Sequence, residues 1–365
     1  MASAPASPSQ VNTWEPSSRS IAARYGLRPE QILRFDLNTS PWPAPVLPAA
    51  LAGPFDPPLS EYPDSWYTDL TAAAAAYVDA AEHEIILGAG ADEVLELVAK
   101  ACLPAGSTAL VPVPTYSMYG VFTTHRAARI VAVPRLADDG YRLNTAALID
   151  RLPEVRVVWL CSPNNPTGLP EREADLAAVL DATTAMTDPP LVVVDEAYFE
   201  FSGQSVAESR TRHPNMLVVR TMSKAFALSG IRVGFGVGDR SVIERLERVR
   251  PPGSVSTISA HIATAALRAP EYAADNARRL SQEREWLAGE LARSGWPSAP
   301  SICNFLLARI GDVEAAEKAA DGLLRAGIVP RPFGPANPLR GHLRLTVRSR
   351  PENERLIEVV RGLTA

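Results

Sequence analysis

The sequence is poor in the residues that form disulfides or bind metals, and it has no long apolar run. Its three cysteines lie far apart in apolar surroundings, which excludes a disulfide framework and predicts reduced core residues at Cys102, Cys161 and Cys303. The five histidines show no metal-ligand spacing, so no metal site is expected. No segment approaches the length of a membrane span, and the net charge of −5 gives no basic surface for nucleic acid. These absences predict a soluble cytoplasmic protein.

The N-terminal part differs in composition from the rest of the chain. Residues 1–20 are rich in Ala, Ser and Pro and lack an apolar segment, which predicts a disordered lead-in rather than a signal peptide. The densest proline cluster lies between Pro41 and Pro63 and predicts an extended arm without a core of its own. The remaining chain is long enough for two domains or one large one.

From residue 84 onward, strand-like runs alternate with helical patterns. The expected strands span residues 84–87, 109–113, 129–133, 155–161, 191–194, 216–220 and 231–237. Such alternation predicts an α/β protein with a mostly parallel sheet covered by helices.

A second, smaller α/β unit is expected after a long helix at residues 258–291. It has expected strands at residues 302–309 and 341–347, with a helix at 313–326 between them. Ser349 and Glu352 form a capping box that begins the last helix.

Lys224 has the most informative surroundings in the chain. It follows a hydroxyl at Ser223, lies among small and apolar residues, and precedes Arg232 by eight positions. A desolvated amine has a lowered pKa and becomes a nucleophile toward aldehydes. The arrangement suits a Schiff base beside a phosphate.

Two other motifs follow buried strands. An Asn-Pro-Thr-Gly segment at 165–168 comes after one apolar run, and an Asp-Glu-Ala-Tyr segment at 195–198 ends another. Ligands of open α/β sheets collect at this edge. Together with the Ser223–Lys224 segment, these motifs resemble the fold-type I aminotransferases that use pyridoxal phosphate (PLP). The likeness runs from about Leu37 to the C-terminus and is greatest to the histidinol-phosphate aminotransferases.

The resemblance implies a domain organisation. It implies the three-layer PLP-transferase fold type I, with a smaller α/β C-terminal domain joined by the N-terminal arm. Residues 21–60 are expected to form an arm that packs with the small domain and a partner subunit. A large PLP-binding domain is expected at 61–255, and the linking helix with the small domain at 256–365.

The same resemblance assigns roles around the cofactor ring. Asp195 is expected to keep the ring nitrogen protonated, with Glu196 as the other acidic candidate. Tyr198 and Asn165 are expected to hydrogen-bond the ring's phenolic oxygen. Without the resemblance, the segment around Asn165 would be a good turn and nothing more. Tyr116 matches the aromatic residue that stacks on the ring, although a core tyrosine is the alternative.

The cofactor phosphate is expected at a helix N-terminus. Ala91 and Asp92 begin a helix directly after a strand, and their free N–H groups favour an anion, with Asp92 expected as a cap. Thr221, Ser223 and Arg232 match the family's other phosphate ligands. Tyr62 matches a tyrosine that reaches the phosphate of the neighbouring subunit, which implies a homodimer with shared active sites.

Substrate contacts are expected from arginines. Arg344 matches the family residue that holds the substrate α-carboxylate, and Arg331 matches a second arginine near the distal group. Two departures stand beside these matches. Asn38 and Trp42 lie in Asn-Thr-Ser-Pro-Trp where the family has Asn-Glu-Asn-Pro-Tyr, so a phenol is lost. Arg348 stands where a Gly-Thr pair is usual, and it could replace that contact or select a different side chain.

Three functions remain open at this point. The first is transamination of histidinol phosphate or a similar donor, with 2-oxoglutarate and glutamate as the second pair, in histidine biosynthesis. The second is another PLP chemistry: the Arg348–Ser349 ending also resembles threonine-phosphate decarboxylase, and Trp42 would suit an aromatic aminotransferase. The third is a non-catalytic nucleotide- or PLP-binding module, but the glycines at 234, 236 and 238 lack the strand-turn-helix setting that dinucleotide binding requires.

Overall fold

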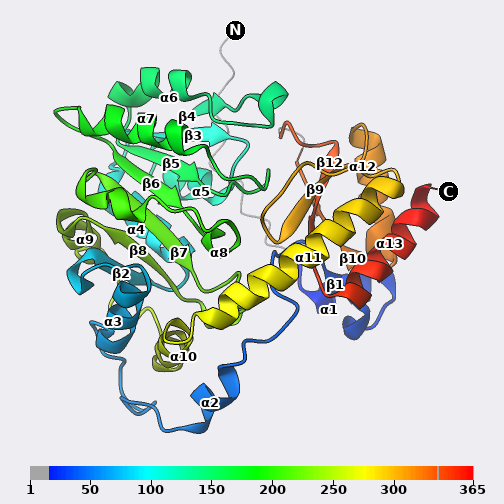
Figure 1. Cartoon of the computed structure of the whole chain (residues 1–365), viewed down its shortest axis with the longest axis horizontal. Helices are drawn as coiled ribbons and strands as arrows, with labels where there is room; N and C mark the ends of the chain where they lie inside the picture. The colour runs from blue at the N-terminus through cyan, green and yellow to red at the C-terminus, as the bar shows by residue number, and fades with distance from the viewer. Residues whose placement is uncertain (1–15, 335–336, 365) are drawn as a thin grey trace.

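The computed structural model describes residues 16–334 and 337–364 and has two lobes, with the longest helix running from one to the other (Figure 1). The larger lobe contains the predicted alternating sheet. Its strands are β2 (Ile85–Gly88), β3 (Thr108–Val113), β4 (Arg129–Pro134), β5 (Val157–Cys161), β6 (Leu191–Asp195), β7 (Met216–Thr221) and β8 (Gly234–Gly238).

In the described part of the chain this sheet has seven strands in the order β2-β8-β7-β6-β5-β3-β4. Strand β8 runs antiparallel to both of its neighbours, and the other pairs are parallel. The register places Asp195 opposite Cys161 on one side and Val219 on the other. The carboxyl ends of β5, β6 and β7 therefore lie side by side.

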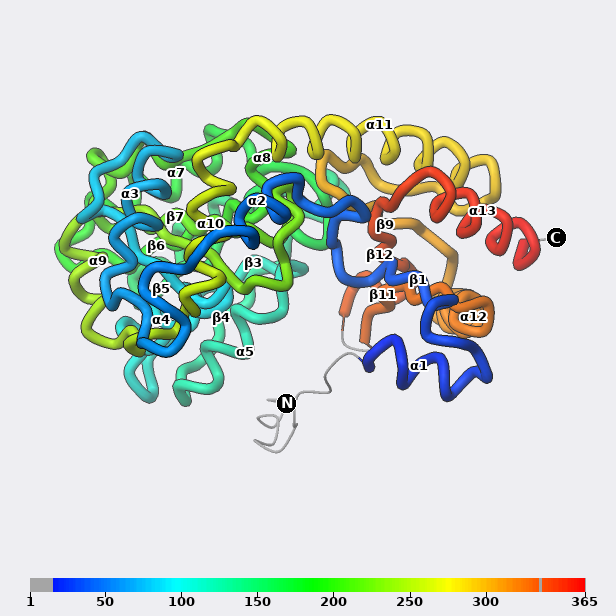
Figure 2. Tube along the Cα trace, turned by 90° about the horizontal axis from the view of Figure 1, so that it is seen from below, coloured from blue at the N-terminus to red at the C-terminus, as the bar shows by residue number. Residues whose placement is uncertain are grey.

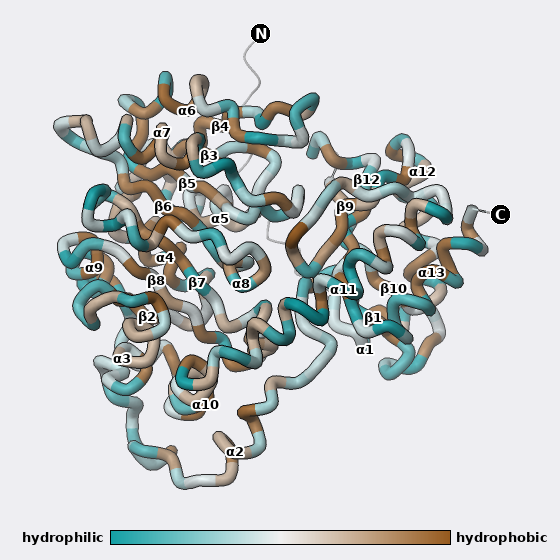
Figure 3. The backbone as a smooth tube through the Cα atoms, in the orientation of Figure 1, coloured by the Kyte–Doolittle hydropathy of each residue, from teal (hydrophilic) through white to brown (hydrophobic). Residues whose placement is uncertain are grey.

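Successive residues of the central strands enter two different cores. On β6, Val192 and Val194 pack into one core, while Leu191 and Val193 pack into the other. The helices of the first face are α3 (Thr68–Tyr77), α6 (Thr145–Arg151), α7 (Glu173–Thr184) and α10 (Thr257–Leu267). The opposite face is covered by α4 (Ala91–Cys102), α5 (Met118–His125) and α9 (Arg240–Glu247). The buried strands are accordingly strongly hydrophobic and lie between two layers of helices (Figure 3).

The smaller lobe has its own sheet and core. Its strands pair in the order β11 (Arg331–Pro332), β12 (His342–Thr346) and β9 (Phe305–Arg309). Leucines of α11 (Glu271–Arg293), α12 (Val313–Arg325) and α13 (Arg350–Thr364) pack on this sheet. Helix α11 lies along one side of the molecule and joins the lobes (Figure 2).

The N-terminal arm belongs to both lobes. Helix α1 (Ser18–Tyr25) and strand β1 (Leu33–Arg34) lie on the smaller lobe, where β1 pairs in parallel with β10 (Ile328–Val329). The chain then crosses to the larger lobe, where α2 (Leu47–Ala52) packs near α10 (Figure 1). In the larger lobe a short helix, α8 (Phe199–Ser202), follows β6.

Two local predictions need correction. The single helix expected at 258–291 is two helices, because α10 ends at Leu267 and Pro270 begins α11. Of the disordered lead-in expected at residues 1–20, residues 1–15 lie outside the described residues. The end of that prediction is wrong, because helix α1 begins at Ser18, and Ser17 caps it by accepting a hydrogen bond from Ser20 N. At the other end, Glu352 accepts from the Ser349 N–H, as the capping box requires. No helix in the described ranges is long and apolar enough to span a bilayer.

Candidate active site

A cavity of about 300 Å³ lies at the carboxyl ends of β5, β6 and β7, beside the first turn of α4. Most of the residues that the sequence assigned to the cofactor line it, and these are Ala91, Asp92, Tyr116, Asn165, Asp195, Tyr198, Thr221, Ser223, Lys224 and Arg232. Leu37 and Thr39 of the arm, Cys161 and Ser229 also line it. We call this space the cofactor cavity. Within the described ranges, no cluster of His, Cys, Asp and Glu could hold a metal ion.

Asp195 is the buried acid of the cofactor cavity. Its carboxylate accepts hydrogen bonds from the Tyr119 hydroxyl at 2.7 Å and from the Ala197 N–H at 3.0 Å. Burial raises the pKa of Asp195 to about 6, and the two hydrogen bonds act against that increase. The acid is therefore mostly ionised at neutral pH and remains able to pair with a protonated ring nitrogen.

Glu196, the other acidic candidate, binds protein groups outside the cofactor cavity. Its side chain is buried, pairs with Arg220 at 2.7 Å, and accepts from Val206 N and the Ser205 hydroxyl. Glu196 is not among the residues that line the cofactor cavity. The geometry favours Asp195 as the partner of the ring.

Lys224 follows β7 and lines the cofactor cavity. Its Nζ donates a long hydrogen bond of 3.4 Å to the Leu37 carbonyl and lies 5.7 Å from the centroid of the Tyr198 ring. Burial, and then the nearby Arg344 charge, lower the pKa of Lys224 to about 8. A substantial fraction of this amine is neutral near physiological pH and is then nucleophilic.

Tyr198 and Asn165 line both cavities together with the amine, and each is held by a residue from outside the larger sheet. The Tyr198 hydroxyl accepts from the Asn38 side-chain N–H at 2.9 Å, while Asn165 accepts from the Arg344 guanidinium at 2.8 Å. Burial raises the pKa of Tyr198, so this phenol stays protonated.

The opposite end of the cavity has the features of a phosphate site. Helix α4 starts at Ala91, and no side chain caps its first N–H groups. The Thr221 and Ser223 hydroxyls, 3.0 Å apart, and the Arg232 guanidinium complete the site. A Cβ on Gly90 would come within 2.6 Å of Arg232, and one on Gly234 within 2.3 Å of Ala91 N. Both glycines are needed for this close approach.

These residues fit pyridoxal phosphate. One cavity contains a buried acid, an amine with a lowered pKa, two polar groups for a ring oxygen and a helix N-terminus that can bind an anion. The predicted capping role of Asp92 is wrong, because Gly90 is the N-cap. The Asp92 carboxylate instead accepts from the Tyr116 hydroxyl at 3.0 Å and pairs with Arg232 at 3.4 Å.

A second cavity, of about 360 Å³, adjoins the first and shares Leu37, Tyr116, Asn165, Tyr198 and Lys224 with it. We call it the substrate cavity. Its outer wall comes from the smaller lobe, where Arg331 on β11 lies directly opposite Arg344 on β12. Side chains of directly opposed residues lie on the same face of a sheet, so both guanidinium groups line this space.

Two predicted substrate residues are not there. Trp42 is not among the residues of either cavity, and the Arg279 guanidinium lies 3.9 Å from the centroid of its ring. Arg348 is also outside both, because its Nη2 pairs with Glu352 at 2.7 Å one helical turn away. The geometry argues against direct substrate contact by either side chain.

Asn38 lines the substrate cavity, but its side chain is committed within the protein. Its N–H group donates to Tyr198, and its oxygen accepts from the Thr346 hydroxyl at 3.1 Å. Asn38 therefore holds Tyr198, which differs from the substrate contact predicted for it. The residues that sequence reasoning missed are of this supporting kind and include Tyr119, Thr346 and Asn304, none of which belongs to a recognisable motif.

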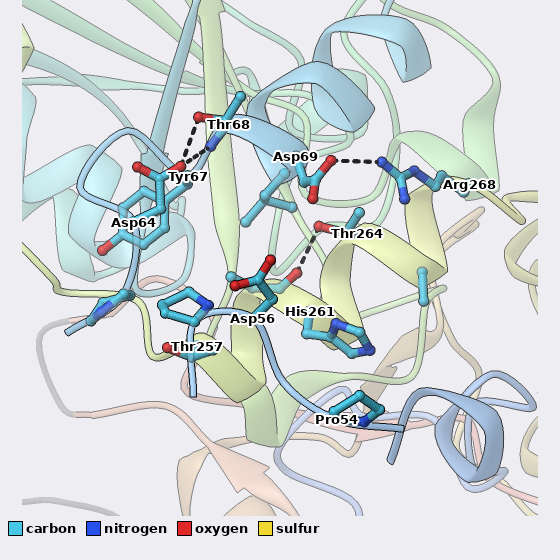
Figure 4. A pocket seen from close by; sticks show the side chains of 15 residues that line it. Pro54, Asp56, Asp64, Tyr67, Thr68, Asp69, Thr257, His261, Thr264 and Arg268 are labelled. Atoms are coloured by element: carbon cyan, nitrogen blue, oxygen red, sulfur yellow. Dashed lines mark hydrogen bonds and ion pairs between the residues drawn. The ribbon is translucent and has the colours of Figure 1, made fainter. Parts of the chain in front are cut away.

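A third cavity, of about 420 Å³, lies between the arm and α10 (Figure 4). Two of its acidic groups pair with other residues that line it: Asp69 with Arg268 at 3.0 Å, and Asp64 with the Thr68 hydroxyl at 2.7 Å. No lysine lines it, so it cannot attach an aldehyde cofactor. Tyr62, in the same arm, is 92% exposed and lines none of the three cavities.

Known proteins share this architecture and sequence. The sequence pattern of the family "Aminotransferase class I and II" matches residues 50–360. The histidinol-phosphate aminotransferase of Methanothermobacter thermautotrophicus is 32% identical over 364 residues, which cover 96% of this chain and 95% of that relative. The enzyme of the same name from Roseiflexus castenholzii is 34% identical, with 93% and 92% covered. A solved histidinol-phosphate aminotransferase from Sinorhizobium meliloti, in complex with pyridoxal-5'-phosphate, has a TM-score of 0.87, with 24% identity over 98% of each chain.

Proposed function

Because the chain belongs to the class I and II aminotransferase family, we propose that it transfers an amino group from histidinol phosphate, or a closely similar donor, to 2-oxoglutarate. The reaction would serve histidine biosynthesis. Membership of the family confirms the resemblance inferred from the motifs, and the solved neighbour confirms the predicted PLP-transferase fold. The protein is a PLP-dependent aminotransferase.

In this proposal the cofactor cavity holds PLP through the residues already described. Asp195 pairs with the ring nitrogen, Asn165 and Tyr198 with the ring oxygen, and the α4 N-terminus with the phosphate. When bound, PLP withdraws electrons from the α-carbon of an attached amino substrate. The protein's part is to place that carbon and to move its proton.

Lys224 is the group that moves the proton. It lines both cavities, so its Nζ faces cofactor and substrate alike. With a pKa of about 8, the amine can accept the α-proton and then donate it as an ammonium, and catalysis by such a group is most effective when its pKa lies near the working pH. The Leu37 carbonyl and the Tyr198 ring hold the amine between these positions.

One observation carries the choice of substrate. Arg331 and Arg344 are direct cross-strand partners and both line the substrate cavity. Two guanidinium groups on the same face of a sheet offer an anion both positive charge and several N–H donors. The phosphate of histidinol phosphate and the carboxylates of glutamate are anions that this pair can bind in turn.

The test is a comparison of donors. Histidinol phosphate should be preferred over histidinol by a large factor in kcat/KM, and Arg331→Ala should reduce that preference rather than lower both activities equally. Arg309→Ala is the matched control, because Arg309 lies on β9 of the same sheet but lines neither cavity. Equal use of an aromatic amino acid would contradict the proposal, and carbon dioxide release from threonine phosphate would move the assignment to a decarboxylase.

We further propose a homodimer with shared sites. Three exposed large apolar residues, Leu51, Leu59 and Tyr62, lie in the proline-rich arm, and Trp66 just after it and Ile258 of α10 are exposed as well. A run of exposed apolar residues on an arm without its own core fits burial against a second copy of the chain. Tyr62 would then reach the partner's cofactor phosphate.

Complementation tests the dimer. Mixing inactive Lys224→Ala and Tyr62→Ala chains should restore part of the activity, because some heterodimers carry one intact site. Mixing Lys224→Ala with Asp195→Asn should restore none, since both residues line the cavity of one chain. A monomer in sedimentation at catalytic concentration would end the idea.

We place the reaction in the cytoplasm. Cys102, Cys161 and Cys303 are all buried free thiols, which suits a reducing compartment.

A further inference from the structure

Tyr119 lies behind the cofactor cavity and makes the shortest side-chain contact to its buried acid. The hydroxyl donates to Asp195 Oδ2 at 2.7 Å, and the ring is fully buried. Tyr119 is not among the residues that line the cavity. It lies edge-on to Tyr116, with ring centroids 5.5 Å apart at an interplanar angle of 83°. Any effect on a bound cofactor must therefore pass through the cavity residues that Tyr119 touches, which are Asp195, Tyr116 and Cys161.

The Tyr119 ring is held by an aromatic stack and a hydrogen-bond chain. It stacks on Trp159 with centroids 5.4 Å apart and planes within 4°. The Trp159 Nε1 donates to the Thr123 hydroxyl at 3.2 Å, and that hydroxyl donates to the Tyr119 carbonyl at 2.7 Å. Thr123 thus ties the aromatic stack to the first turns of α5, which fixes the direction of the Tyr119 hydroxyl.

The Asp195 carboxylate has two different supports. Oδ1 accepts from the Ala197 N–H at 3.0 Å, a local bond within the turn after β6, whereas Oδ2 is held by Tyr119 from a different element. Loss of Tyr119 would leave a buried carboxylate with one hydrogen bond and freedom to rotate about its last torsion.

We propose that Tyr119 is the positioning residue that aims the Asp195 carboxylate at the cofactor ring nitrogen and keeps it ionised. This inference rests on the proposed role of Asp195. Tyr119 does this through hydrogen bonding alone, because its side chain reaches neither cavity. The residue is specific to the ring-nitrogen end of the site, so the phosphate end should not depend on it.

A pH effect follows from the surroundings of Asp195. The ionisable groups that face it are Tyr119 of α5, Tyr116 before α5, Cys161 of β5, Asp92 of α4 and Lys224 after β7. Burial raises the Asp195 pKa to about 6 and the Tyr119 hydrogen bond lowers it, so Tyr119→Phe raises the pKa further. Below its pKa, Asp195 must release a proton to pair with a protonated ring. As the pH is lowered, the affinity for a protonated ring therefore begins to fall at a higher pH in Tyr119→Phe than in the unmodified protein.

The experiment measures binding to the ligand-free protein, independent of turnover. The probes are pyridoxamine 5'-phosphate, which has no aldehyde to react with Lys224, and its analogue with carbon in place of the ring nitrogen. At pH 6, Tyr119→Phe should weaken the binding of pyridoxamine phosphate by about ten-fold or more, as loss of a hydrogen bond to a charged group predicts. The affinity for the carbon analogue should not change. The loss of pyridoxamine phosphate affinity caused by Tyr119→Phe should become smaller as the pH rises to 8.

Two variants separate the explanations. Tyr77→Phe is the matched control, because it removes another phenol hydroxyl that donates to a buried carboxylate, Glu200, at 3.1 Å, away from the cavity. It should not distinguish the two probes. Asp195→Asn should distinguish them, and if it does not, the role of Asp195 itself is wrong. If Asp195→Asn distinguishes the probes while Tyr119→Phe weakens both equally, Tyr119 is only structural and the inference fails.

Discussion

The two adjoining cavities differ in how the chain builds them. The cofactor cavity comes mainly from the larger lobe, where residues that follow adjacent strands of one sheet, with Asp195 in register with Cys161 and Val219, meet the first turn of α4. The substrate cavity is closed by the arm and the smaller lobe, through contacts such as Asn38 with Thr346, which are 308 positions apart. The first therefore depends mainly on the folding of the larger lobe, whereas the second depends on the docking of the smaller lobe and the arm against it.

This difference bears on where the chain departs from the family pattern. A residue at the end of a buried strand has little freedom, so its chemistry is fixed with the fold. A residue on a short edge strand such as β11, or in the arm, can change partners without disturbing a core. Arg348 and Trp42 show this, because both departed from the family pattern and both now bind other residues of the chain.

The largest expected effect is the loss of the amine that serves both cavities. Lys224→Ala should reduce turnover by at least about 10⁴-fold, since it removes both the proton carrier and the covalent link. The fold should persist, because Nζ makes only a long hydrogen bond to Leu37. Single-turnover amino transfer and thermal melting measure the two effects, with Lys100→Ala, on the outer face of α4, as control. A yellow, borohydride-reducible adduct on another lysine would remove Lys224 from its role.

The next effect distinguishes the two neighbouring acids. Asp195→Asn should slow proton transfer by roughly 10²- to 10⁴-fold while PLP stays bound through its phosphate. Glu196→Gln should instead cost stability, because it leaves Arg220 buried without its charge partner, a change of about 3–5 kcal/mol. Rates per folded molecule and denaturant unfolding measure the two outcomes. A near-normal rate in Asp195→Asn would give the role to Glu196.

The sequence predicted the α/β fold from its periodicity, whereas the roles of the cofactor residues came from the family resemblance and stay predictions. Apolar runs set the strands, alternation set their parallel order, and the polar residue after each run had to lie at one edge. The helix break at Pro270 and the start of α1 were missed because both depend on single turns, and the short strands β1, β10 and β11 were missed because two residues form no pattern.

Supporting residues could not be predicted in this way. Tyr119 looks like any apolar-face residue of α5, and its role exists only because that helix packs against the end of β6. Asn38 has a backbone φ of 53° and its partners lie in two lobes, which no local pattern encodes. Side chains that act through long-range packing become visible only in the structure.

Asn38 joins the two cavities, so its replacement tests how independent they are. Asn38→Gly keeps the left-handed backbone but removes the hydrogen bond to Tyr198, which should lower the rate by about ten-fold. Because that bond lowers the pKa of Tyr198, the visible spectrum of the bound cofactor should also change. Thr346→Val, which removes the partner of Asn38 but not its bond to Tyr198, is the control. Equal loss in both variants would show that Asn38 only joins the lobes.

Arg344 tests whether the substrate cavity tunes the cofactor cavity. Its charge helps to lower the Lys224 pKa to about 8, so Arg344→Gln should raise that pKa. The neutral amine captures the aldehyde, and the rate of PLP capture by the ligand-free protein should rise through pH 8 and shift to higher pH in the variant. Stopped-flow absorbance measures the midpoint. Arg309→Ala should leave it unchanged, and an unmoved midpoint in Arg344→Gln would mean that the two cavities are electrostatically separate.

The smallest expected effect concerns Arg348, which differs from the family pattern without facing either cavity. Its guanidinium lies just before α13 and pairs with Glu352 in the first turn of that helix, and partly exposed pairs of this spacing contribute only about 0.3–0.5 kcal/mol. Arg348→Ala should therefore leave the preference for histidinol phosphate over histidinol unchanged and lower the melting temperature slightly. Arg331→Ala, measured beside it, should reduce the preference with little change in melting. A loss of phosphate preference in Arg348→Ala would show that its pair with Glu352 opens when substrate binds, and that the substrate cavity is assembled only then.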